Sequence, residues 1–149
     1  MGDRTTVTLT VPNEFADTVE EIEEAQERDP STEGDLIYLT YYEVNYGELR
    51  FLEKLKEQGI PYDSAWCAGC EYGSGTRSLR FTPEGEAIEL ELYDADANPE
   101  MRALMVLIDD PVALRQYILD HQASRQVLPW DNQVEYGKIY RTRQLIAPQ

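Results

Sequence analysis

The sequence predicts a single α+β domain in which helices pack against one mixed sheet. Residues 5–11 and 86–93 alternate apolar and polar side chains with the period of a strand, and residues 35–44 are an almost continuous apolar and aromatic run. Residues 14–26 and 48–58 instead repeat apolar side chains at helical spacing. A length of 149 residues is typical of one domain, and no repeat or boundary divides the chain.

The first half of the chain is predicted to be β-α-β-α-β. The first helix has one narrow apolar stripe, formed by Phe15, Val19 and Ile22. The second helix ends at Gly59, which suits a left-handed C-terminal position, and Pro61 prevents its continuation. Residues 60–67 then form the third predicted strand. Because helices alternate with strands here, crossover connections and parallel pairing are expected.

The second half begins with a β-hairpin, residues 76–82 and 86–93, around the turn Pro83-Glu84-Gly85. Asn98-Pro99 and Asp110-Pro111 each place a capping residue before a proline, which predicts helices over 99–109 and 111–122. Their apolar residues are expected to face inward: Met101, Leu104, Met105 and Ile108 on one, and Leu114, Tyr117 and Ile118 on the other. An irregular stretch then leads to a predicted C-terminal strand, residues 138–146.

The charge is strongly negative and unevenly distributed. The chain has 29 acidic and 13 basic residues, a net charge of −16. Residues 14–35 hold ten acids and one base, Arg28, whereas residues 84–100 hold seven acids and no base. A field of this sign attracts cationic surfaces and repels nucleic acid and anionic membranes. No apolar run approaches the ~20 residues of a membrane span, and the N-terminus lacks an apolar signal core, so a cytoplasmic protein is expected.

The acidic residues of the first helix form candidate partner-binding rows: Glu14, Asp17, Glu20, Glu21, Glu24 and Glu27. Steps of about 4.5–6 Å along a helix are comparable with the 3.4 Å phosphate spacing of DNA, so these rows could imitate a nucleic-acid backbone. Glu89 and Glu91, on the face of their predicted strand opposite Ile88, Leu90 and Leu92, would extend the patch if the fold brings them alongside. The alternative is a solvated face that aids solubility, or charge neutralised by the basic C-terminal strand.

Trp130 and Tyr136 lie in the long irregular stretch and are candidate aromatic anchors for a partner. The alternative is that they plug the core where the loop crosses one end of the sheet. The sequence favours neither interpretation.

Cys67 and Cys70 have the spacing of a redox or metal-binding pair. Redox chemistry needs the first thiolate at a helix N-terminus, but Glu71 and a glycine-rich loop follow. Zinc needs four ligands, and the chain offers one cysteine pair and one histidine, His121, which is expected to be structural. Asp63 or Glu71 could complete such a site. We therefore expect no metal and no cofactor, with Cys67, Cys70 and His121 as the alternative.

In size and charge the chain resembles the acidic inhibitors that mobile elements use against host nucleic-acid enzymes, including DNA-mimic anti-restriction and anti-CRISPR proteins. The resemblance covers composition only, and toxin immunity proteins share it. It implies a non-enzymatic protein that occupies a basic, nucleic-acid-binding site on a partner, by steric and electrostatic occlusion. The alternatives are a metal- or redox-active protein centred on the cysteine pair, and a toxin-immunity-like or structural, oligomeric module.

Overall fold

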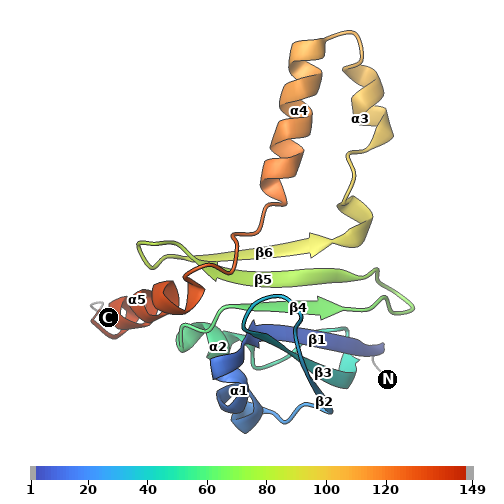
Figure 1. The fold of residues 1–149 in the computed structure, drawn as a ribbon. Coiled ribbons are helices and arrows are strands. Elements are labelled where there is room, and N and C mark those ends of the chain that lie inside the picture. The colour runs from blue at the N-terminus through green and yellow to red at the C-terminus, as the bar shows by residue number, and fades with distance from the viewer. Residues whose placement is uncertain (1–2, 147–149) are drawn as a thin grey trace.

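The computed structural model describes residues 3–146 and confirms the α+β class, with one six-stranded sheet and five α-helices (Figure 1). The strands are β1 (Arg4–Pro12), β2 (Glu27–Pro30), β3 (Leu36–Asn45), β4 (Tyr62–Trp66), β5 (Gly75–Phe81) and β6 (Ala87–Tyr93). The helices are α1 (Ala16–Ile22), α2 (Leu52–Glu57), α3 (Met101–Val106), α4 (Pro111–Ser124) and α5 (Gln133–Ile146), with short 3₁₀ turns η1 (Asn13–Phe15) and η2 (Asp94–Asp96).

The strands are ordered β2-β3-β1-β4-β5-β6, and every neighbouring pair is antiparallel. The prediction of a mixed sheet with parallel neighbours was therefore wrong. β3 and β4 do run in the same direction, because each is antiparallel to β1, but β1 lies between them. The predicted hairpin is confirmed as β5 and β6.

The first connection differs from prediction because its helix is short. The seven residues of α1 span roughly 10 Å, against roughly 30 Å for β1, so α1 cannot return the chain to the start of β1. β3 instead begins beside the end of β1, where Pro12 pairs with Leu36. The chain after α1 forms β2, an edge strand that the sequence did not predict. All four β2 residues are exposed, so no apolar alternation marks it.

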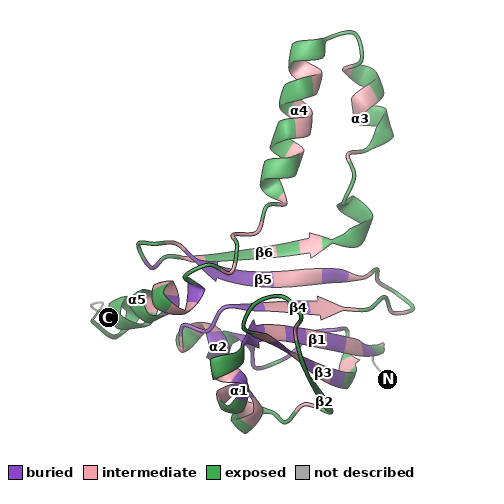
Figure 2. Cartoon of the chain, in the orientation of Figure 1, coloured by how far each residue is buried: buried purple, intermediate pink, exposed green. Residues whose placement is uncertain are grey.

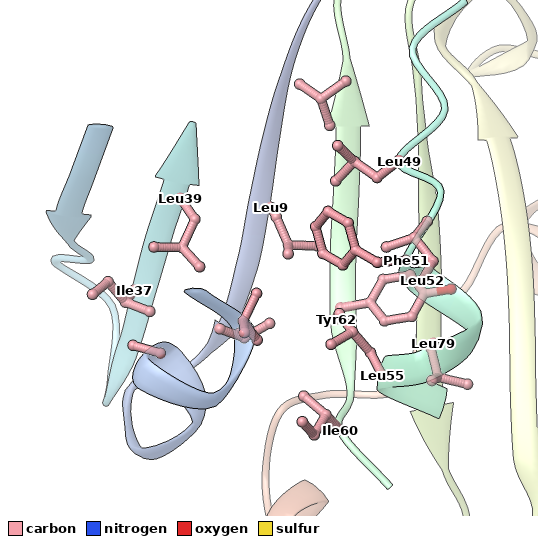
Figure 3. Close-up of a cluster of buried hydrophobic side chains, with 14 of the residues drawn as sticks. Leu9, Ile37, Leu39, Leu49, Phe51, Leu52, Leu55, Ile60, Tyr62 and Leu79 are labelled. Carbon is pink, nitrogen blue, oxygen red and sulfur yellow. The ribbon is translucent and has the colours of Figure 1, made fainter. Parts of the chain in front are cut away.

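The core lies on one face of the sheet, which we call the core face (Figure 3). Val7, Leu9 and Val11 alternate with half-exposed threonines along β1, so one side of this strand is fully buried. Helices α1 and α2 cover this face with buried apolar side chains: Ala16 and Val19 from α1, and Leu52 and Leu55 from α2.

The C-terminal segment is a helix, α5, so the predicted strand over 138–146 was wrong. Tyr136 and Tyr140 are about one helical turn apart on the side of α5 that packs against the core. Between them Gly137 lies directly against the main chain of Gly59. The expected basic strand therefore does not exist, and Lys138 pairs with Glu135 of its own helix, at 3.6 Å.

Helices α3 and α4 form an arm, residues 99–125, that projects beyond the edge strand β6 (Figure 1). A helix lies in each predicted region. α4 begins at Pro111 as expected, and the Asp110 carboxylate caps it by accepting a hydrogen bond from the Ala113 N–H at 3.1 Å. α3 is shorter than predicted and begins at Met101, so the expected Asn98-Pro99 cap does not form. The expected burial is wrong, because no second layer covers the arm (Figure 2). Met101 is 70% exposed, and neither helix contains a buried residue. No helix within residues 3–146 is long and apolar enough to cross a membrane.

Candidate functional site

The first acidic stretch, residues 14–35, runs through η1, α1 and β2 at one edge of the sheet, and we call this region the acidic edge. Arg28 pairs with Asp17 at 3.0 Å and with Glu20 at 2.8 Å, and these hydrogen bonds raise the pKa of the Arg28 guanidinium. Within residues 3–146 no ion pair involves the other candidates: Glu14, Glu21, Glu24 and Glu27.

The regular carboxylate rows expected along one long helix do not form. Glu14 lies in the 3₁₀ turn η1, and α1 ends at Ile22, so Glu24 and Glu27 continue on extended chain and on β2. The acidic edge therefore has a concentrated negative charge without the repeating spacing of a phosphate backbone.

The second acidic stretch lies at the opposite edge, because its strand, β6, is the last in the sheet order. Five inter-strand spacings separate β2 from β6, which amounts to roughly 24 Å. The two stretches are therefore not contiguous. Glu89 pairs with Lys56 of α2 at 2.8 Å, and this hydrogen bond raises the pKa of the Lys56 ammonium. Glu91 is also partnered, by Arg77 of β5.

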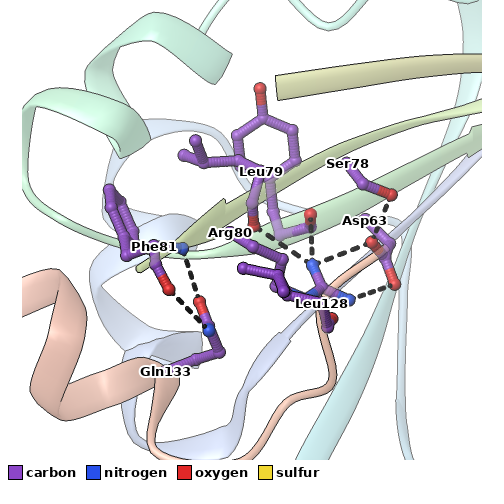
Figure 4. Close-up of polar contacts among 8 residues, drawn as sticks. Asp63, Ser78, Leu79, Arg80, Phe81, Leu128 and Gln133 are labelled. Carbon is purple, nitrogen blue, oxygen red and sulfur yellow. Dashed lines mark hydrogen bonds and ion pairs between the residues drawn. The ribbon is translucent and has the colours of Figure 1, made fainter. Parts of the chain in front are cut away.

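Trp130 and Tyr136 both have partners within the chain. The Arg80 guanidinium lies over the Trp130 ring, 3.6 Å from its centroid, and Tyr136 packs against the core. Arg80 is only 3% exposed and forms two hydrogen bonds with the Asp63 carboxylate, at 3.0 and 3.1 Å (Figure 4). Arg80 also donates to the main-chain oxygen of Leu128 at 2.9 Å. Arg80 therefore links the segment before α5, which contains Leu128 and Trp130, to the sheet.

The alternative site at the cysteines is not assembled. Cys67 and Cys70 are both exposed, free thiols in the loop after β4, whereas His121 is on the arm, where its Nε2 lies 3.4 Å from the Ala97 oxygen. Asp63 is occupied by Arg80 and by Ser78. Within residues 3–146, no group of three or more His, Cys, Asp or Glu side chains is placed to hold a metal ion.

A cavity lies on the core face, where β4, β5 and β6 extend beyond the packed core. Two adjacent rows across these strands form its floor. In one row Trp66 pairs with Gly75, which pairs with Tyr93; in the next, Ser64 pairs with Arg77 and Arg77 with Glu91. Gly75 is required because the Trp66 ring lies against it, leaving no space for a Cβ.

Two loops form the walls of this cavity. Tyr46, Gly47 and Glu48 follow β3, and Tyr72 comes from the loop after β4. The Tyr46 and Tyr72 ring centroids are 6.2 Å apart, and those of Trp66 and Tyr93 are 5.8 Å apart in an edge-to-face arrangement. The cavity has a volume of about 190 Å³ and four aromatic rings in its lining. We call it the aromatic pocket.

The cysteine loop has a structural role in this pocket. The Glu71 N–H donates to the Asp3 carboxylate at 3.0 Å, and the Gly69 N–H donates to the main-chain oxygen of Tyr72 at 3.0 Å. The Trp66 indole N–H donates to the main-chain oxygen of Gly73 at 2.8 Å. These bonds fold the loop so that Tyr72 closes the pocket. Cys67 and Cys70 therefore lie in a tight loop whose shape positions Tyr72 beside the cavity.

The aromatic pocket was not predicted from the sequence. Its residues come from six segments between positions 46 and 93, and only the pairing of β4, β5 and β6 aligns Trp66 with Tyr93. The available signal was compositional: ten tyrosines and two tryptophans are more aromatic side chains than the core itself uses.

No protein-family model matches the chain, and neither a curated protein nor a solved structure was found to resemble it.

Proposed function

We propose that this is a non-enzymatic, cytoplasmic binding protein that uses its acidic edge to occupy a basic site on a partner protein, one that handles nucleic acid. The observation that carries the proposal is the set of carboxylates without an ion pair on η1, α1 and β2: Glu14, Glu21, Glu24 and Glu27. Residues 14–35 have ten acids and one base, so most of this negative charge has no counter-charge within the stretch.

The mechanism is occlusion by a complementary field rather than detailed imitation of a phosphate backbone. Complementary charge raises the association rate and selects the partner, and it also repels nucleic acid from this protein itself. Trp130 and Tyr136 are engaged in the fold, so the aromatic contribution to affinity has to come from elsewhere on the surface.

The test is a matched pair of charge variants. Glu21, Glu24 and Glu27 are replaced by Gln in one protein, and Glu84, Glu86 and Asp96 by their amides in the other, so both lose three exposed negative charges. The tagged proteins are used to capture basic nucleic-acid enzymes from a lysate, and retained partners are challenged with duplex DNA. The proposal expects capture of a partner that DNA displaces, and loss of capture only with the first variant. Equal capture by both variants would overturn it.

A structural, oligomeric module is the second candidate, and the arm favours it. Val106 and Val112 are 83% and 80% exposed, at the tip of an arm without a covering layer. Residues 99–125 contain four acids and three bases, so the arm carries −1 of the net charge of −16. Two arms could therefore associate through apolar side chains with little charge repulsion.

Sedimentation velocity distinguishes this second candidate. If the arm mediates self-association, the wild type is a concentration-dependent oligomer, and Val106→Ser with Val112→Ser makes it a monomer. The matched control is Leu145→Ser, which removes an apolar side chain that is 77% exposed on α5. A wild-type protein that is monomeric at high concentration would exclude self-association.

A further inference from the structure

We propose that the aromatic pocket binds a trimethylammonium group, carried either by a methylated lysine side chain or by a free quaternary amine. The pocket lies over β4, β5 and β6, whereas the acidic edge lies at β2, the other end of the sheet. The inference therefore does not depend on the proposed function, and each can fail separately.

The lining has the composition of a cation cage. Rings from Tyr46, Trp66, Tyr72 and Tyr93 meet around one cavity, and the negative faces of such rings attract a cation within about 6 Å. A volume of about 190 Å³ equals the space of about six water molecules, enough for a trimethylammonium head and its first methylene group. A methylated cation suits such walls because its methyl groups are poorly hydrated.

The charges in the pocket also favour a cation. Glu48 and Glu91 contribute two negative charges, and Arg77 contributes one positive charge. Arg77 is held loosely, because its Nη2 lies 3.9 Å from the Glu48 carboxylate and 3.4 Å from that of Glu91, longer than the 2.7–2.9 Å of a strong charge-assisted bond. One negative charge therefore remains uncompensated beside the rings. An anionic ligand at Arg77 would face both carboxylates.

One residue in the wall of the pocket has a strained backbone. Tyr46 has φ = 54°, a left-handed conformation that is uncommon for residues other than glycine. The Tyr46 N–H donates to the Asp3 oxygen at 2.6 Å, which fixes the turn and the position of the Tyr46 ring. The Tyr72 hydroxyl is buried and has no hydrogen-bond partner among the described residues.

The first experiment is an NMR titration with choline chloride and with its neutral carbon isostere, 3,3-dimethylbutan-1-ol. We expect choline to shift the indole N–H signal of Trp66 in a saturable way and to leave that of Trp130 unchanged, because Trp130 is stacked on Arg80 elsewhere. We expect no saturable shift from the isostere. Absence of a choline shift, or an equal response to the isostere, would overturn the proposal.

Variants then connect binding to the pocket itself. Tyr93→Leu removes one ring and should weaken choline binding about 2- to 30-fold, and Glu48→Gln should weaken it to a similar degree. Tyr42→Leu and Glu57→Gln are the matched controls, because both residues are exposed and neither lines the pocket. Control variants that weaken binding equally would overturn the proposal. Thermal melting establishes that each variant is folded.

Short neutral peptides carrying one lysine, either unmethylated or trimethylated, separate the two sources of the group. Tighter binding of the trimethylated peptide than of choline would assign the pocket to a methylated protein, and the reverse order would assign it to a small amine. Both orders support the trimethylammonium proposal. Equal affinity for the unmethylated and trimethylated peptides would overturn it, since simple charge would then explain binding.

Discussion

The side-chain amide of Gln133 forms two hydrogen bonds with the main chain of Phe81: the Phe81 N–H donates to Gln133 Oε1 at 2.7 Å, and Gln133 Nε2 donates to the Phe81 oxygen at 2.9 Å (Figure 4). β4 starts at Tyr62 opposite Leu79, so Phe81 extends beyond it and has no strand partner on that side. Gln133 supplies the missing partner and so attaches the first turn of α5 to the sheet.

Gln133→Leu should therefore be strongly destabilising although the side-chain volume is similar. The substitution leaves a buried donor and a buried acceptor of Phe81 unpaired, and each unsatisfied group costs about 1–3 kcal/mol. We expect the free energy of unfolding to fall by about 2–4 kcal/mol in urea denaturation. Gln144→Leu, at an exposed position of the same helix, is the control. Equal stability of the two variants would contradict this account of how α5 is attached.

Gly137 should not tolerate a side chain. Its Cβ would overlap the main-chain oxygen of Gly59, and Gly59 has φ = 70°, a conformation in which the glycine cannot easily be replaced. Alanine would gain up to about 1 kcal/mol of helix propensity but would separate α5 from the sheet, and overpacking costs about 1–3 kcal/mol. We expect a net loss of stability for Gly137→Ala in thermal denaturation.

Gly73→Ala is the matched control for Gly137→Ala. A Cβ at Gly73 would meet no atom within 4 Å, so we expect little change in the melting temperature. A stable Gly137→Ala protein would mean that α5 can move away from Gly59 without loss.

The α+β class and most elements were predictable from the sequence because their signals are local. The alternation in β1, the hairpin turn before β6, and the Asp110-Pro111 cap of α4 act within a few residues. β2 was not predictable, because its conformation depends on pairing with β3 and its four side chains are all exposed. Residues 138–146 contain β-branched and aromatic residues, which favour a strand locally. In the structure they belong to a helix in which Tyr140 packs against the core and Gly137 lies against Gly59.

The candidate site was only partly predictable. The acidic stretches can be recognised from composition, whereas the cavity depends on how the strands pair in the folded sheet. The two acidic stretches are evident in the sequence, but their placement at opposite edges depends on the strand order. The aromatic pocket depends on the alignment of Trp66, Gly75 and Tyr93 across three strands. A shift of one residue in either pairing would turn one of these side chains to the other face.

Arg80 should be essential for stability. It points to the face opposite the core face, and it pairs with Asp63, donates to the Tyr62 and Leu128 oxygens and lies over Trp130. Arg80→Met would leave the Asp63 carboxylate without its partner, and removing one member of a buried pair costs about 3–5 kcal/mol. Because the Asp63 side chain is 27% exposed and water can solvate it, we expect a loss at or below the lower end of that range in urea denaturation.

Arg80→Lys should recover only part of this loss, because an ammonium cannot reproduce the two parallel bonds to Asp63 or the stacking on Trp130. Arg102→Met, on the exposed side of α3, is the control and should leave stability unchanged. An Arg80→Met protein as stable as this control would show that Asp63 is adequately solvated without Arg80.

Stability should decrease at alkaline pH because two core tyrosines resist ionisation. Burial raises the pKa of Tyr62 to about 12, and burial together with the charges of Glu23 and Glu20 raises that of Tyr41. In the unfolded chain both pKa values are about 10. Between these values the unfolded chain releases protons that the folded chain retains, so rising pH favours unfolding. The stabilisation is complete below about pH 10 and diminishes as the pH approaches 12.

Urea denaturation at pH 8, 10 and 11.5 tests this expectation. Tyr62→Phe should reduce the slope of unfolding free energy against pH, because phenylalanine has no proton to release. Tyr41→Phe should reduce the slope too. It should also lower the free energy of unfolding at pH 8 by about 1 kcal/mol, because the Tyr41 hydroxyl donates to the main-chain oxygen of Glu23 at 3.0 Å. Tyr117→Phe, on the arm, is the control for the same substitution outside the core. A slope that neither core variant changes would assign the alkaline loss to repulsion among the 29 carboxylates as the lysines lose their charge.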